Sequence, residues 1–75
     1  MIKERSKDLQ GVIDKLDEAY YRLEEILSEE QEAFDNMPEG LQQSERGETM
    51  EEGIGTMEDA LSSIEDTKDS LEELA

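Results

Sequence analysis

The sequence predicts an all-α fold, an antiparallel hairpin of two long helices covering about residues 3–35 and 45–74. Three observations predict this fold. Apolar residues recur at helical spacing over the first segment, and they do so again over the second. The stretch between the two segments holds the only proline of the chain. At 75 residues the chain has room for one small domain, residues 1–75.

The first helix is predicted from three adjacent rows of apolar residues between Ile2 and Phe34. Residues within a row are seven apart, so each row follows one side of a helix. Three rows together make an apolar stripe wider than a coiled-coil seam, and a stripe this wide favours contact with more than one neighbouring helix. The rows are Ile2, Leu9, Leu16 and Leu23; Val12, Ala19, Ile26 and Ala33; and Ile13, Tyr20, Leu27 and Phe34.

The second helix is predicted from apolar residues that alternate steps of four and three from Met50 to Ala75, which is a heptad pattern. Small residues run beside this pattern, and the outer positions are mostly acidic. Pairing the helices antiparallel gives a register in which paired residue numbers sum to about 84. The residues expected in the seam between the helices are Leu9, Leu16, Leu23, Ile26, Met50, Ile54, Met57, Leu61, Ile64 and Leu71.

Residues 36–44 are predicted to connect the helices. Pro38 cannot continue a helix interior, and Gly40 permits a sharp turn. The sequence "PEGL" is compatible with a single helical turn within the connection. Ser44 is a good N-cap residue for the second helix.

Two polar residues interrupt the apolar stripes and leave alternatives open. Glu30 faces Ile54 in the predicted register, so either its carboxylate reaches over the neighbouring glycines to solvent or the helices part near the connection. Lys68 lies in the heptad seam, where a single polar residue often sets register or oligomeric state.

Composition excludes most chemistry. The chain has no histidine and no cysteine, which are the commonest metal ligands, and we expect no catalytic, cofactor or metal site. A calcium loop beginning at Asp35 fails because its twelfth position is Arg46, not a carboxylate. No apolar leader and no membrane-length apolar run is visible, so a cytoplasmic, non-enzymatic protein is expected.

The stretch "FDNMPEGLQQSERGETMEE", from Phe34 to Glu52, resembles small acidic helical-hairpin proteins of bacteriophages and of mobile elements of Gram-positive bacteria. The repeats at Leu61, Ile64 and Leu71 fit that pattern loosely. The resemblance covers over half of the chain and implies a phage or prophage origin. It also implies the host cytoplasm as location and the blocking of host nucleic-acid-binding or defence proteins as activity.

The net charge of −16 predicts the kind of partner. Such a surface repels nucleic acid and anionic lipid and attracts basic proteins. We expect an acidic protein-binding module that mimics nucleic acid, or alternatively a structural protein that pairs through its apolar seams with itself or a larger helical partner. A homodimer forming a four-helix bundle is expected, with no membrane, small-molecule substrate or directly bound nucleic acid. The candidate partner-binding residues are Tyr21, Met37, Leu41, Glu51, Glu52, Glu58, Asp59, Glu65 and Asp66.

Overall fold

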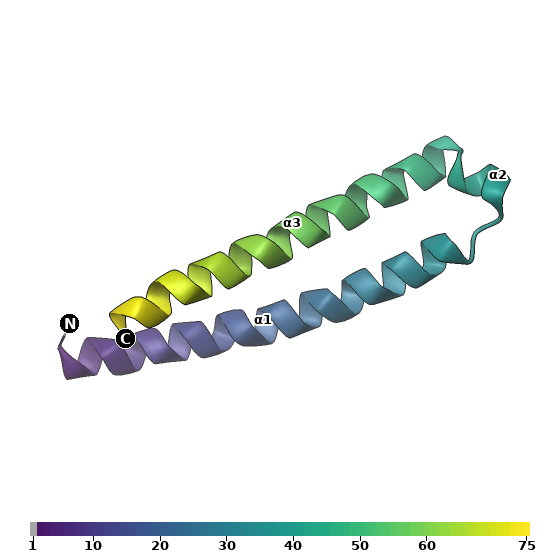
Figure 1. The fold of residues 1–75 in the computed structure, drawn as a ribbon. Coiled ribbons are helices and arrows are strands. Elements are labelled where there is room, and N and C mark those ends of the chain that lie inside the picture. The colour runs from purple at the N-terminus through teal and green to yellow at the C-terminus, as the bar shows by residue number, and fades with distance from the viewer. Residues whose placement is uncertain (1) are drawn as a thin grey trace.

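The computed structural model describes residues 2–75, and every regular element in that range is an α-helix. Helix α1 spans Lys3–Asp35, the short helix α2 spans Glu39–Gln42, and helix α3 spans Glu45–Leu74. Figure 1 shows α1 and α3 lying side by side in opposite directions, with both ends of the chain together and α2 at the far end. The predicted all-α fold and the predicted bounds of the long helices are confirmed. None of the helices within residues 2–75 is long and apolar enough to cross a membrane.

The seam between α1 and α3 is formed by two rows from each helix. In α1 and in α3 alike, the seam residues are three and four positions apart, as in an antiparallel coiled coil. The most buried apolar side chains are Ile13, Ile54 and Leu61, which are 3%, 6% and 9% exposed. The other apolar seam residues are half-buried: Leu9, Leu16, Tyr20, Leu23, Leu27, Phe34, Met50, Met57, Ile64 and Leu71.

The third apolar row of α1 does not enter this seam, and here the prediction was wrong. Ile26 was expected to face Met57, but its side chain is 39% exposed, and Val12 is 48% exposed. Tyr20 and Leu27 lie on the side of α1 that faces α3 instead. The physical reason is the width of the contact, because a pair of helices covers only two adjacent rows on each partner. The row of Val12, Ala19, Ile26 and Ala33 is exposed along its whole length.

The molecule is a rod with a thin core. Its extents are 58 × 15 × 12 Å and its radius of gyration is 17.1 Å, whereas a globular chain of this length has a radius of gyration of about 11 Å. Its accessible surface is 5686 Å², about 1,000 Å² more than the roughly 4,700 Å² of a globular protein of this mass. The hairpin therefore leaves exposed an area of the size that protein interfaces bury.

The connection is held by hydrogen bonds to backbone atoms. The side-chain amide of Gln42 donates to the carbonyl oxygen of Phe34 at 2.8 Å, which ties α2 to the end of α1. The hydroxyl of Ser44 donates to the carbonyl oxygen of Leu41 and accepts the N–H of Gly47 at 3.4 Å, so Ser44 caps α3. Gly47 is buried directly against the α2 backbone. These contacts fix where α3 begins relative to α1.

Candidate protein-binding faces

One side of the rod is an acidic face. Residues Asp17 and Glu24 of α1 line the same open pocket as Glu65 of α3, which shows that the acidic rows beside the seam lie on one side of the molecule. All of these carboxylates are exposed except that of Asp17, which is half-buried. We call this surface the acidic face; beside the seam it comprises Asp17, Glu24, Glu51, Glu58, Glu65 and Glu72, and its outer edges, one residue further along each helix, comprise Glu18, Glu25, Glu52, Asp59, Asp66 and Glu73.

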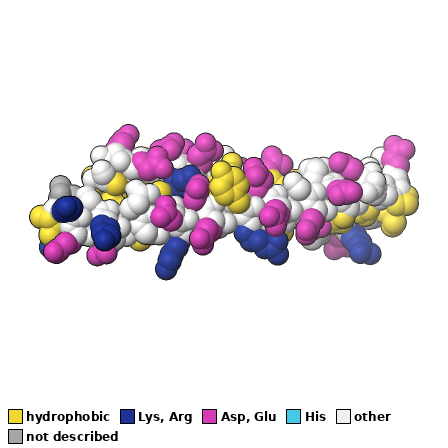
Figure 2. Space-filling model, turned by 90° about the horizontal axis from the view of Figure 1, so that it is seen from below, with side chains coloured by type: hydrophobic (Ala, Val, Ile, Leu, Met, Phe, Trp, Pro, Cys, Tyr) yellow, Lys and Arg dark blue, Asp and Glu magenta, His cyan; other side chains and the backbone are white. Residues whose placement is uncertain are grey.

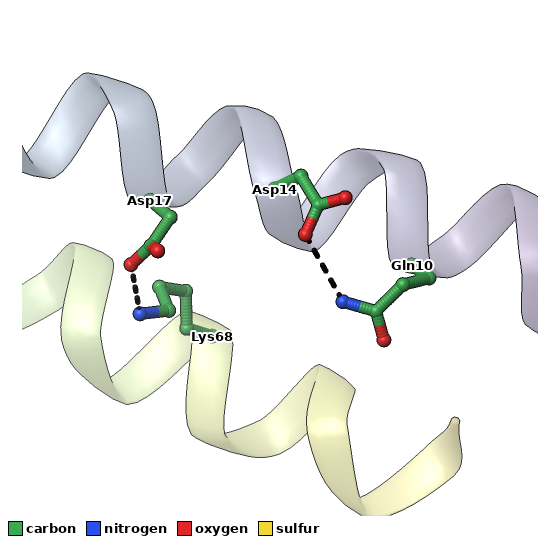
Figure 3. Close-up of polar contacts among 4 residues, drawn as sticks. All are labelled: Gln10, Asp14, Asp17 and Lys68. Carbon is green, nitrogen blue, oxygen red and sulfur yellow. Dashed lines mark hydrogen bonds and ion pairs between the residues drawn. The ribbon is translucent and has the colours of Figure 1, made fainter.

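A single ion pair joins the two long helices within residues 2–75. The ammonium group of Lys68 leaves the seam and donates to a carboxylate oxygen of Asp17 (Figure 3). The hydrogen bond that Lys68 donates to Asp17 raises the pKa of Lys68 above its ordinary value, against the opposing effect of partial desolvation. The two residue numbers sum to 85, which agrees with the predicted antiparallel pairing, in which paired numbers sum to about 84. Lys68 thus links the two long helices, a role that the heptad pattern alone left open.

An open pocket of about 340 Å³ surrounds this ion pair. Its aromatic wall is formed by Tyr20 and Tyr21, whose ring centroids are 5.7 Å apart at an edge-to-face angle of 87°. Tyr21 is 58% exposed, and its ring lies among the carboxylates of the acidic face. Desolvation, followed by the charges of Glu65 and Glu24, raises the pKa of Tyr20. An aromatic surface with a negative rim suits a lysine or arginine side chain.

The predicted contact residues of the connection lie elsewhere. Met37 is half-buried and Leu41 is 49% exposed, and both belong to the end of the rod where α2 joins the long helices (Figure 1). Glu58 borders a separate open groove of about 550 Å³ beside the last turns of α1. Glu30 is half-buried and makes no ion pair within residues 2–75. The structure thus places Tyr21 and the predicted acids of α3 on the acidic face and leaves Met37 and Leu41 outside it.

The opposite side of the rod is poor in acids, a feature that the sequence reasoning missed. Figure 2 shows most of the basic side chains along one long edge, whereas acidic side chains lie along both edges and across the face in view. On α3 this side consists of uncharged residues, all small except Leu74, at alternating steps of four and three. Small residues beside the heptad pattern were expected, but not that acids are missing from them and from the next row. We call this side the acid-poor face; it comprises Val12, Ala19, Ile26 and Ala33 of α1 and Thr49, Gly53, Thr56, Ala60, Ser63, Thr67, Ser70 and Leu74 of α3.

Charged residues border the acid-poor face in an uneven way. Of the 23 acids only Asp8 and Glu29 lie in its outer row on α1, which they share with the bases Lys15 and Arg22, and Arg5 lies seven residues before Val12 in the apolar row itself. Arg22 forms an ion pair with Glu25 at 3.0 Å, but both side chains are about two-thirds exposed, so this pair contributes little to stability. Along α1, the acid-poor face of a molecule of charge −16 is thus bordered by three bases and two acids.

Comparisons with protein-family models, with curated proteins and with solved structures give no match for this chain. The case for function accordingly depends on the geometry and charge of the two faces.

Proposed function

We propose that this protein is a non-enzymatic binding module whose acidic face occupies a basic cleft of a nucleic-acid-binding or defence protein of a host cell. The observation that carries the proposal is the regular pairing of carboxylates along one side of the rod. On α3 the pairs repeat every seven residues over the length of the helix: Glu51/Glu52, Glu58/Asp59, Glu65/Asp66 and Glu72/Glu73.

The spacing of these pairs matches that of a nucleic-acid backbone. Seven residues of α-helix rise about 10.5 Å. Three phosphate steps along one DNA strand rise about 10.2 Å. The pairs Asp17/Glu18 and Glu24/Glu25 of α1 form a second row that runs antiparallel to the first, as the two strands of a duplex do. In a cleft that binds successive phosphates, a carboxylate pair would thus lie at every third phosphate position.

A pull-down from host lysate with a matched pair of variants tests the proposal. The test variant neutralises the acidic row nearest the seam of α3: Glu51→Gln, Glu58→Gln, Glu65→Gln and Glu72→Gln. The control carries the same charge change at exposed positions outside the acidic face: Glu4→Gln, Asp8→Asn, Glu29→Gln and Glu39→Gln. Each protein that is retained by the unaltered chain is then purified and its dissociation constant measured against NaCl concentration.

The proposal requires three results together. The test variant loses the partner and the control keeps it. The logarithm of affinity falls steeply with the logarithm of salt concentration, because the contact is electrostatic. Duplex or single-stranded nucleic acid competes for the same partner. Equal loss of binding in both variants would show only a dependence on net charge and would contradict recognition by the acidic face.

A second candidate function, assembly through apolar contacts, is favoured by the exposed row of α1. Val12 and Ile26 are 48% and 39% exposed, although only three apolar side chains within residues 2–75 are buried, and Leu74 on α3 is 57% exposed. Exposed apolar residues along one line are typical of a surface that another helix covers. This function predicts association that depends little on salt, in contrast to binding by the acidic face.

A further inference from the structure

We infer that the acid-poor face is covered by a second copy of this chain, with α1 of each copy lying antiparallel over α3 of the other. A two-fold axis parallel to the long axis of the hairpin produces this arrangement and keeps both connections at the same end of a four-helix bundle. The inference deepens the assembly function and rests on it. It is independent of the acidic rows beside the seam, which lie on the opposite side of each hairpin; only the outer row of Asp59, Asp66 and Glu73 lies near the second copy.

The side chains of the two helices are complementary in size in this arrangement. Within one hairpin, Asp17 and Lys68 mark equal height along the rod, so residues whose numbers sum to about 85 lie level. The same sum applies across the two-fold axis, because rotation about the long axis leaves heights unchanged. Ile26 of one copy then lies between Thr56 and Ala60 of the other. Small residues on α3 allow the close approach that a bulky side chain on α1 needs.

The charges of the two helices are complementary as well. Lys15 and Arg22 lie on the outer edge of the acid-poor face of α1, and the acids Asp59, Asp66 and Glu73 lie on the adjoining edge of α3. At equal heights Lys15 lies between Asp66 and Glu73 of the other copy, and Arg22 lies between Asp59 and Asp66. Each base thus meets two carboxylates. The guanidinium has donors left for them beside its bond to Glu25.

The other two-fold pairing, which lays α1 over α1 and α3 over α3, lacks this complementarity. It brings the row of Asp59, Asp66 and Glu73 against its own copy, and like charges at an interface are unfavourable. The exposed area agrees with dimerisation through one face. The excess of about 1,000 Å² per chain is close to the roughly 800 Å² per partner that a stable interface buries.

Cysteine cross-linking tests the arrangement directly, because the chain has no cysteine of its own. Ala19 and Thr67 are exposed residues of the acid-poor face, and their numbers sum to 86, so they lie nearly level across the proposed axis. An equimolar mixture of the single variants Ala19→Cys and Thr67→Cys, oxidised under mild conditions, should give a disulfide-linked heterodimer as the main product. Predominance of cross-links between identical variants would overturn the arrangement, because those pairs lie apart in it.

Sedimentation equilibrium tests whether a second copy of the chain covers the acid-poor face. The unaltered chain should be a dimer at low micromolar concentration. Ile26→Lys should be a helical monomer, whereas Leu41→Lys, the same type of change at an exposed residue outside the face, should remain a dimer. A monomeric unaltered chain would refute the second copy as occupant.

A charge exchange keeps the inference falsifiable if Ile26→Lys fails to fold. Arg22→Glu should raise the dimer dissociation constant by at least about tenfold at low salt. Adding Asp59→Arg and Asp66→Arg to the same chain should restore the dimer. Failure of this rescue would exclude the proposed contact between α1 and α3. Ile26→Lys and Arg22→Glu leave every carboxylate of the acidic face in place, so with these two variants the dimer can fail while binding of a basic partner persists; the four Glu→Gln changes beside the seam test the converse.

Discussion

Gly47→Ala should destabilise the hairpin, although alanine is the better helix former. A Cβ atom at position 47 would lie 2.1 Å from the carbonyl oxygen of Gln42, 2.5 Å from its carbonyl carbon and 2.6 Å from the carbonyl oxygen of Leu41. All three are backbone atoms, so no side-chain rotation relieves the overlap. The connection must therefore move away from α3 by a substantial part of an ångström, which weakens the Ser44 cap and the bond from Gln42 to α1.

The magnitude follows from two opposing effects. Overpacking at a tight contact costs about 1–3 kcal/mol, and more where only backbone can give way. Replacing glycine by alanine within a helix raises the free energy of unfolding by about 1 kcal/mol. We expect a net loss of about 1–2 kcal/mol in the free energy of unfolding. For a domain of this size, 1 kcal/mol corresponds to roughly 4–8 °C in melting temperature.

Gly55→Ala supplies the matched control, because it makes the same chemical change in the same helix with an empty surrounding. No heavy atom lies within 4 Å of the Cβ position at Gly55, so the alanine should raise the free energy of unfolding by about 1 kcal/mol. Circular dichroism at 222 nm, followed through urea and thermal unfolding at one protein concentration, measures both variants. If Gly47→Ala proves as stable as the unaltered chain or more so, the tight contact between α2 and α3 does not exist in solution.

Three further predictions concern the connection and the charges. Gln42→Ala should lower the free energy of unfolding by about 1 kcal/mol in urea titrations, because it removes the bond to the Phe34 carbonyl, whereas exposed Gln43 should tolerate alanine. Because the pKa of Lys68 is raised in the folded chain, the ion pair of Lys68 contributes fully to the free energy of unfolding below about pH 10, and this contribution is lost at higher pH. The melting temperature of the unaltered chain should therefore fall more between about pH 9 and 11.5 than that of Lys68→Met, and Lys15→Met is the control. Increasing NaCl from about 0.05 to 0.5 M should raise the melting temperature, because salt screens the mutual repulsion of a chain with charge −16, and a fall would show that attractive pairs dominate.

The helix bounds could be predicted because local chemistry decides them. Pro38 prevents α1 from continuing, and Ser44 provides the cap from which α3 begins. The two ends of the connection are therefore encoded within a few residues. The hydrogen bond from Gln42 to Phe34 is different, because it joins residues eight apart whose positions depend on how the chain turns.

The covered side of α1 could not be predicted from its apolar pattern. Three rows are equally apolar in the sequence, and spacing alone does not say how many helices will cover them. Within one chain, α1 packs against a single long helix, α3. Helix α3 covers the rows of Ile13 and Leu16 and leaves the row of Ile26 exposed. The same limit applies to Lys68, because it pairs with Asp17, 51 residues away in the chain, and this pairing depends on the register between the two long helices.

The two proposals together define a stoichiometry. When the acid-poor faces of two copies meet, the acidic faces point away from each other on opposite sides of the bundle, because each hairpin has one of its two sides in the interface. The dimer then presents two equal acidic faces along a rod of 58 Å, and the other copy approaches only their outer edge at Asp59, Asp66 and Glu73. We therefore expect one basic partner per chain and two per dimer, which sedimentation velocity or mass photometry of the complex can count. Ile26→Lys should bind a single partner with unchanged affinity but should lose the ability to bridge two. A partner bound only once per dimer would place part of its contact on the acid-poor face and would contradict the assignment of one face to the partner and the other to the second copy.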